Sequence, residues 1–217
     1  ARALRAVHSS FYLSAHTVSI GLIGPGLVGS ALLDQIASQV ERLRRDFKID
    51  LRVRGIAGSR AMRLVQGSVD LARWREEYAA GAGPVDLERF ADHVHADQFP
   101  HAVIIDCSAN AELANRYAHW LSEGIHIVTP NKKANSAGYE YYERMRESRR
   151  AAGSHYLYEA TVGAGLPVIQ TLRDLRETGD EIRRIEGMFS GTLAYLFNTW
   201  DGSQSFSSVV RQAKALG

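Results

Sequence analysis

The chain has 217 residues, of which 45% are hydrophobic and 23% charged, with a formal net charge of +2. This composition is typical of a globular protein with one large domain or two small ones. We expect no membrane segment, because no apolar run approaches about 18 residues, and no nucleic-acid partner, because the basic residues are scattered. The single cysteine, Cys107, excludes a disulfide framework.

Both ends of the sequence suggest a piece of a longer protein. The opening residues, ARALRAVHSSFYLS, resemble neither a signal peptide nor the start of a compact fold. The last residues, QAKALG, end as a helix ends at a C-cap glycine. We therefore expect residues 1–16 to be a linker from an upstream domain.

Strands and helices alternate through residues 17–153. The predicted strands are 17–23, 51–57, HAVIIDCS and HIVTP, and the predicted helices are 30–45, 112–123 and 136–152, with a less regular stretch over 62–98. This succession predicts an α/β fold with a Rossmann-type doubly wound parallel sheet. It corresponds to an NAD(P)-binding domain over residues 17–153.

The pattern changes after residue 153. The predicted elements are a strand HYLYEATVG, a helix GLPVIQTLRDLRETG, a strand EIRRIEGMFS and the helices GTLAYLFNTW and FSSVVRQAKALG. We expect residues 154–217 to form part of a second α/β domain for the substrate and for dimerisation.

The glycine-rich stretch IGPGLVGS stands where the first strand turns into the first helix. Gly24, Gly26 and Gly29 fit the pattern G-x-G-x-x-G, which provides a tight turn, room for a pyrophosphate and close packing of the helix on the strand. We predict that residues Gly24, Pro25, Gly26, Leu27, Val28 and Gly29 bind a dinucleotide. The alternative is a glycine turn that serves packing alone.

The choice between dinucleotides depends on the far end of the second strand. Asp50 lies about 20 residues beyond the glycine motif, but at the beginning of that strand, which is the wrong end to hold ribose hydroxyls. The far end carries Ser59, Arg60 and Arg63 and no carboxylate. An arginine there can pair with a 2′-phosphate, so NADP(H) is favoured over NAD(H). The alternative is that these arginines are solvent-exposed loop residues.

Several stretches together resemble one enzyme family. VTPNKKANS, YEATVGAGLPVIQTL and FSGTLAYLFN, which follow the IGPGLVGS motif in that order, resemble homoserine dehydrogenase. RAVHSSFYLS and LDQIASQVERLRRDFKIDLRVRGI resemble the version fused behind aspartate kinase. The resemblance implies NAD(P)H-dependent interconversion of L-aspartate 4-semialdehyde and L-homoserine in threonine and methionine biosynthesis, a fused aspartate kinase domain and a homo-oligomer. It also implies the cytoplasm of a bacterium, or the plastid stroma of a plant or alga.

The same resemblance assigns roles to two residues that follow strand ends. Lys132 would contact the nicotinamide side of the cofactor and the substrate, and would help in proton transfer. Ser108 would contact the cofactor near its nicotinamide half. From the residues alone, an exposed pair of Lys132 and Lys133 that caps a loop is the favoured interpretation, and the resemblance reverses it. Cys107 is better explained as a small buried residue than as a nucleophile.

The resemblance further implies a sodium ion bound to backbone carbonyl groups of the loop EATVGAGL. The matching positions are Glu159, Val162, Ala164 and Leu166. Hard cations accept carbonyl oxygens as ligands, and a glycine-rich turn can direct several of them inward. The alternative is a plain strand-to-helix turn. The eight histidines show no spacing typical of a zinc site.

In the family, the helix ending at ALG is followed by an acidic segment that holds the substrate amine and then by a catalytic lysine. We therefore expect the 217-residue chain alone to turn over little or no substrate. Two other functions stay open: a catalytically silent NADP-binding module for assembly or regulation, and a different NADP-dependent oxidoreductase on the same scaffold.

Overall fold

The computed structural model describes residues 16–81 and 83–216, so the expected linker 1–16 lies outside the described residues except for its last position. The chain divides into two compact units between Tyr158 and Glu159. No helix in the described ranges is long and apolar enough to cross a bilayer.

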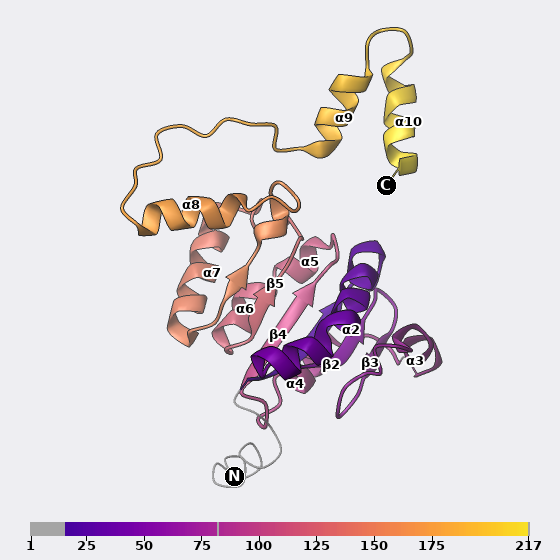
Figure 1. Ribbon diagram of the computed structural model, residues 1–217, viewed down its shortest axis with the longest axis vertical. Coiled ribbons are helices and arrows are strands. Elements are labelled where there is room, and N and C mark those ends of the chain that lie inside the picture. The colour runs from indigo at the N-terminus through magenta and orange to yellow at the C-terminus, as the bar shows by residue number, and fades with distance from the viewer. Residues whose placement is uncertain (1–15, 82, 217) are drawn as a thin grey trace. The chain divides into compact units, whose positions relative to one another are not determined.

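The first unit is built on a six-stranded sheet with the order β3-β2-β1-β4-β5-β6 (Figure 1). Its strands are β1 (Thr17–Ile23), β2 (Asp50–Ala57), β3 (Met62–Leu64), β4 (His101–Asp106), β5 (His126–Val128) and β6 (Tyr156–Leu157). Only β3 is antiparallel to its neighbour; every other pair is parallel. The predicted doubly wound α/β sheet is therefore confirmed, and residues 156–157, expected in the second domain, extend it by one strand.

Helices cover both faces of this sheet. Helix α2 (Leu27–Phe47) lies in front of the sheet in Figure 1 and packs Leu33 and Ile36 against apolar side chains of β1 and β2. The opposite face is covered by α4 (Leu87–Val94), α6 (Tyr117–Ser122) and α7 (Tyr139–Ala152). Neighbouring strand residues such as Ile104 and Ile105 belong to different clusters because successive side chains point to opposite faces.

Phe90 of α4 occupies a space on the sheet that two glycines leave open. A Cβ at Gly21 of β1 would lie 2.6 Å from a ring carbon of Phe90, and one at Gly55 of β2 would lie 2.7 Å from another. These distances are too short for real contacts, so both positions require glycine for the ring to lie this close to the strands. The helix that carries Phe90 thereby packs close to the sheet.

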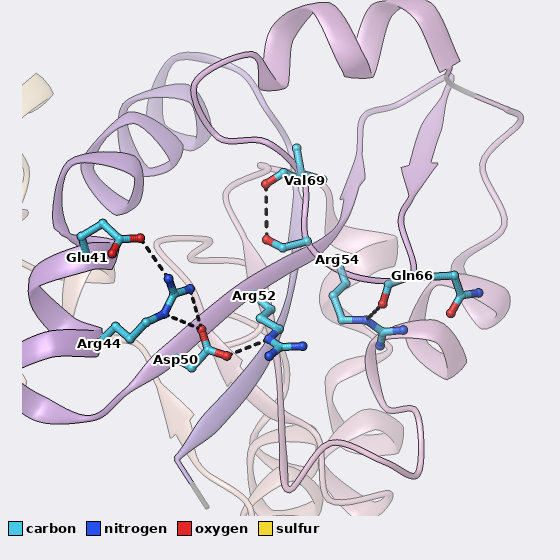
Figure 2. A network of polar contacts seen from close by, with 8 residues as sticks. Glu41, Arg44, Asp50, Arg52, Arg54, Gln66 and Val69 are labelled. Carbon is cyan, nitrogen blue, oxygen red and sulfur yellow. Dashed lines mark hydrogen bonds and ion pairs between the residues drawn. The ribbon is translucent and has the colours of Figure 1, made fainter. Parts of the chain in front are cut away.

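The beginning of β2 carries a surface network of charges (Figure 2). Asp50 accepts hydrogen bonds from Arg44 of α2 at 2.8 Å and from Arg52 at 2.7 Å. Burial raises the pKa of Asp50, but these two arginines outweigh that effect and hold the pKa below its usual range. The structure thus gives Asp50 a role in joining α2 to β2, at the opposite end of the strand from the predicted cofactor position.

A second arginine of β2 is almost wholly buried. Only 1% of Arg54 is exposed, and its Nε donates to the carbonyl oxygen of Gln66 at 3.2 Å (Figure 2). Its Nη1 donates to the carbonyl of His93 in the last turn of α4, where the helix dipole favours a cation. The guanidinium lies 4.2 Å from the centre of the Phe99 ring. Arg54 therefore ties together β2, the loop after β3 and the end of α4.

The structure corrects several predicted elements of the first unit. The helix predicted over 112–123 is two short helices, α5 (Ala111–Ala114) and α6, separated at Asn115 and Arg116. The strand predicted as HIVTP ends at Val128. The helix predicted to begin at residue 136 is α7, which begins at Tyr139 after its N-cap residue, Gly138. In the irregular stretch 62–98 the structure forms β3, α3 (Trp74–Gly81) and α4.

The regular elements in the described part of the second unit are all helices. After the short 3₁₀ turn η1 (Glu159–Thr161) come α8 (Val168–Glu177), α9 (Gly191–Thr199) and α10 (Phe206–Leu216). The strand predicted over 181–190 is wrong: these residues form no regular element and pair with no strand of the described chain. A strand needs a neighbour to bond its backbone groups, and a local sequence pattern cannot provide one.

Candidate functional site

The glycine motif forms the turn between β1 and α2, as predicted from the sequence. Gly24 has a φ of 86°, in the region that favours glycine, and a Cβ on it would lie 2.9 Å from the backbone nitrogen of Ser108. A Cβ on Gly29 would lie 2.1 Å from the carbonyl oxygen of Gly24. A Cβ on Gly26 would meet nothing within 4 Å. The outer two glycines are thus needed for packing, whereas the middle one borders open space.

The N-terminus of α2 is well suited to bind an anion. Gly26 is its N-cap and provides no side-chain hydrogen bond, and the first turn carries no acidic residue. The first N–H groups of a helix have no partner within the helix and stand at the positive end of its dipole. Without a capping side chain or a carboxylate, these groups are free to bind a phosphate group.

A cleft of about 750 Å³ opens beside this helix terminus. Its volume lies within the range of about 300–1,000 Å³ that small-molecule sites occupy. Of the residues predicted to bind the cofactor, Gly24, Pro25, Gly26, Ser59, Arg60 and Ser108 line the cleft, whereas Leu27, Val28, Gly29 and Lys132 do not. The structure therefore brings three predicted segments, the loops after β1, β2 and β4, to one cavity.

The loop after β2 gives this cleft a positive charge. Ser59 and Arg60 are exposed, and Arg60 makes no hydrogen bond or ion pair with the described residues. Arg63 points elsewhere, with its Nη1 3.5 Å from the carbonyl oxygen of Gly81. Glu112, on α5, is the carboxylate that lines the cleft. The arginine, with no acid at the end of β2, fits a phosphate better than a pair of ribose hydroxyls.

Three other polar residues of the cleft were not predicted from the sequence. Arg116 lies at the start of α6 and pairs with Glu88 of α4. Tyr78 of α3 donates to the carbonyl oxygen of Ala61 at 2.8 Å, which fixes the loop that carries Arg60. Asn110 is the N-cap of α5. Arg116 and Tyr78 lie on helices that the sequence pattern did not resolve, so no local signal identified them.

A buried polar cluster lies at the carboxyl ends of β4 and β5. Asp106, the last residue of β4, is fully buried and accepts a hydrogen bond from the backbone nitrogen of Ser108 at 2.7 Å. Its other oxygen accepts from Asn131 Nδ2 at 2.9 Å and from the Tyr117 hydroxyl. Burial and the charge of Asp106 raise the pKa of Tyr117. The signal for this cluster was in the sequence, because polar residues at the ends of adjacent parallel strands share one edge of the sheet.

Lys132 follows this cluster directly and is exposed. Its side chain makes no hydrogen bond or ion pair within the described ranges, while Lys133 N donates to Asn131 Oδ1 at 3.0 Å. Leu27 and Val28, in the first turn of α2, are 87% and 53% exposed. None of Lys132, Leu27 and Val28 lines the cleft.

Cys107 is half-buried between β4 and Ser108. Burial, together with the charge of Asp106, raises the pKa of its thiol to about 11. At neutral pH the residue is thus a thiol, which is a poor nucleophile. This supports the interpretation of Cys107 as a small packing residue.

The loop predicted to bind sodium lies at the start of the second unit. Gly163 and Ala164 both have positive φ angles, 71° and 51°, which turn the chain sharply. The Glu159 carboxylate accepts hydrogen bonds from Ile169 N at 2.9 Å and Gln170 N at 2.8 Å, so it caps the first turn of α8. The carbonyl oxygen of Leu166 accepts from Val168 N.

Comparisons with known proteins agree with this geometry. Residues 24–159 match the sequence family described as homoserine dehydrogenase, NAD binding domain, and residues 167–217 match the family described as homoserine dehydrogenase. The chain is 55% identical, over its whole length, to 24% of bifunctional aspartokinase/homoserine dehydrogenase 1, chloroplastic, of Arabidopsis thaliana. It is 34% identical, also over its whole length, to 26% of the bifunctional enzyme of Buchnera aphidicola. The chain thus spans about a quarter of these relatives.

Among solved structures, the chain is similar to a hyperthermophilic archaeal homoserine dehydrogenase in complex with NADPH. The TM-score is 0.73 and the sequence identity 25%, over 93% of this chain and 61% of the other.

Proposed function

Because the chain belongs to the homoserine dehydrogenase family, we propose that it forms the cofactor-binding part of an enzyme that interconverts L-aspartate 4-semialdehyde and L-homoserine. The observation that carries this proposal is the cleft at the N-terminus of α2, which combines an uncapped helix end, an open Gly26 and the free Arg60. The enzyme would serve the synthesis of threonine and methionine.

We propose that NADP(H) is the cofactor and that NAD(H) binds more weakly. The pyrophosphate would lie against Gly26 and the first turn of α2, where its charge meets the free N–H groups. The 2′-phosphate would pair with Arg60, helped by Ser59, since no acid at the end of β2 opposes it. Ser108, on the loop after β4, would contact the cofactor nearer its nicotinamide half.

In this reaction the bound cofactor supplies or accepts a hydride at the carbon of the aldehyde or alcohol group. The chain's own contribution is to place a proton donor beside the reacting oxygen. Lys132 stands after the end of β5, at the edge of the sheet where α/β proteins bind ligands. Its ammonium group would stabilise the developing alkoxide and help to protonate it when the aldehyde is reduced.

The sodium site is a further part of the proposal. The carbonyl groups of Val162 and Ala164 accept no backbone hydrogen bond from the described residues, and those of Glu159 and Leu166 accept one each. A carbonyl oxygen has two lone pairs, so all four can still bind a cation. Sodium there would fix the loop that precedes α8.

Assembly and location are proposed from the exposed apolar surface and from the relatives. Helices α9 and α10 leave large apolar side chains exposed, among them Leu193, Phe197 and Leu216. Such surfaces favour burial against another chain, so we propose a homodimer. We also propose a fused aspartate kinase, because both relatives are bifunctional aspartokinase/homoserine dehydrogenases. We propose a plastid location because the chloroplastic plant relative is far more similar to this chain than the bacterial one.

The test is an assay of the full-length protein that carries this chain. We expect homoserine-dependent reduction of NADP⁺, followed at the absorbance of NADPH, and a slower reaction with NAD⁺. Cofactor binding without any turnover would instead support the silent NADP-binding module, and turnover of another alcohol alone would support a different oxidoreductase.

A further inference from the structure

We propose that the Asp106 carboxylate is a positioning residue that fixes the distance between two loops of the site. These are the cofactor loop, residues 107–110, which carries Ser108, and the lysine loop, residues 129–133, which carries Lys132. The inference rests on the proposed function, since it concerns where Lys132 stands relative to the bound cofactor.

Each oxygen of Asp106 holds a different loop. Oδ1 accepts a hydrogen bond from Ser108 N at 2.7 Å, within the cofactor loop. Oδ2 accepts from Asn131 Nδ2 at 2.9 Å, within the lysine loop. One rigid planar group therefore joins both loops. Because Asp106 is fully buried and does not line the cleft, it cannot touch the cofactor or the substrate.

Asn131 carries the connection on to Lys132. Its backbone nitrogen donates to Thr129 Oγ1 at 2.8 Å, and its Oδ1 accepts from Lys133 N at 3.0 Å. Its Nδ2 also donates to the carbonyl oxygen of Asn110 at 3.0 Å, which is a second link between the loops. Lys132 thus stands between two residues whose backbones are held.

The carboxylate suits this position better than any neutral group. Ser108 N and Asn131 Nδ2 can only donate, and the Tyr117 hydroxyl donates as well, so Asp106 faces donors on every side. An ionised carboxylate accepts all of them. An asparagine at this position would turn an NH₂ group toward one of these donors and would break the link to one loop.

The cofactor loop is in turn packed against the glycine turn. A Cβ on Gly24 would lie 2.9 Å from Ser108 N and 3.0 Å from the carbonyl carbon of Cys107, so no space separates the two backbones. A shift of the cofactor loop must therefore move the turn that would hold the pyrophosphate. Asp106 consequently acts on both the cofactor end and the lysine end of the site.

Asp106→Asn tests the proposal, with Tyr117→Phe as the matched control. Both substitutions disturb the same buried carboxylate. Tyr117→Phe removes the hydroxyl contacts with Asp106 and Thr129 but keeps both links from the carboxylate to the loops, whereas Asp106→Asn breaks one of those links. In the full-length protein we expect Asp106→Asn to lower kcat for homoserine oxidation about tenfold or more, as the loss of a hydrogen bond to a charged group implies. Tyr117→Phe should lower the melting temperature yet leave kcat within about threefold.

A kcat near that of the wild type in Asp106→Asn would overturn the proposal, as would an equal loss in Tyr117→Phe. Should Asp106→Asn fail to fold, Asn131→Leu removes the same link from the other side. It is expected to lower kcat similarly, and a kcat near the wild-type value would overturn the proposal.

Hydrogen exchange separates this proposal from the proposed function. If the wild-type protein neither binds NADP(H) nor turns over homoserine, the proposed function fails, and the loops can still be examined. Asp106→Asn should then speed amide exchange in residues 107–110 and 129–133 together, while Tyr117→Phe leaves both slow. Unchanged exchange in either loop of Asp106→Asn would show that the carboxylate does not hold them.

Discussion

The α-carbon of Gly29 packs against the carbonyl oxygen of Gly24 so closely that a Cβ on Gly29 would lie 2.1 Å from that oxygen. This contact seats the first turn of α2 on the end of β1. Gly26, between the two, has no such neighbour. The three glycines of the motif are therefore separable by experiment, since only the middle one leaves room for a side chain.

Gly26→Val should abolish cofactor binding in a protein that stays folded. The valine side chain would fill the space beside the helix terminus, where the pyrophosphate is expected to lie. A titration of the chain with NADPH, followed by fluorescence, measures the effect, and circular dichroism checks the fold. If the variant binds NADPH as the wild type does, the turn serves packing alone.

Gly29→Ala is the contrasting control. Its methyl group would collide with the backbone of Gly24, and overpacking of this kind costs about 1–3 kcal/mol of unfolding free energy. We expect a lower melting temperature together with weaker binding. A stable Gly29→Ala would contradict the close packing of α2 on β1.

Arg60→Ala should weaken the binding of NADPH by about 1–3 kcal/mol, the scale of a hydrogen bond to a charged group, and leave NADH almost unchanged. The physical reason is that only NADPH carries the 2′-phosphate. Isothermal titration with both cofactors provides the measurement, and Arg63→Ala, whose side chain turns toward Gly81, is the matched control. Equal losses for NADPH and NADH would refute the assignment of Arg60.

Lys132→Ala should reduce turnover of homoserine in the full-length protein by roughly 100-fold or more, the scale of a group that acts in proton transfer. Steady-state kinetics provides the measurement. Lys133→Ala is the control, since that residue is its exposed neighbour. Similar rates for both variants would exclude Lys132 from the reaction.

The stability of the first unit should depend on the protonation of His126. Burial and the charges of His155 and His101 lower its pKa from 6.5, and its Nδ1 accepts a hydrogen bond from His155 N at 2.9 Å. The unfolded chain then binds this proton more readily than the folded one. The contribution of His126 to the free energy of unfolding is therefore complete above about pH 6.5 and is lost as the pH falls below that value.

His126→Gln should reduce the loss in the free energy of unfolding as the pH falls below about 6.5. Urea unfolding at pH 7.5 and 5.5 compares the variant with the wild type, and His119→Gln, at an exposed position of α6, is the control. The prediction fails if His126→Gln loses as much stability between the two pH values as the wild type does.

Arg54→Lys should destabilise the protein by about 2 kcal/mol, because an ammonium group cannot reproduce the forked contacts of a guanidinium with two carbonyl groups. Burial lowers the pKa of Arg54 to about 10, mostly through the loss of water around the charge. Arg52→Lys, two residues earlier on the same strand, is the control in chemical denaturation. Equal losses in both variants would show that the burial of Arg54 adds nothing.

Sequence patterns predicted the sheet well because its strands are apolar runs and its first turn has a distinctive glycine spacing. Gly24, Ser59 and Arg60 were predicted from such patterns and Ser108 from the family resemblance, and all four line one cleft. Arg116 was missed because its place depends on where a helix breaks. The predicted helix over 112–123 gave no sign of that break, which brings Arg116 beside Glu88.

The failure at residues 181–190 has a different cause. EIRRIEGMFS was predicted to be a strand from its local sequence, but a strand is defined by its hydrogen-bonded neighbour. Within the described residues no such neighbour lies beside it. Asp106 depends on the fold in the same way, since its role comes from a hydrogen bond with Asn131, which lies 25 positions away in the sequence. Local patterns identify elements, and only the fold shows which of them meet.

The contact of Phe90 with Gly21 and Gly55 has a consequence for the evolution of this protein. Helix α4 also carries Leu87, which lines the cofactor cleft. A methyl group gained at either glycine would push the ring, its helix and that wall of the cleft outward together. A Cβ at Gly21 would also lie 2.5 Å from Val94, so relatives with a smaller residue than phenylalanine should tolerate alanine at Gly55 but not at Gly21.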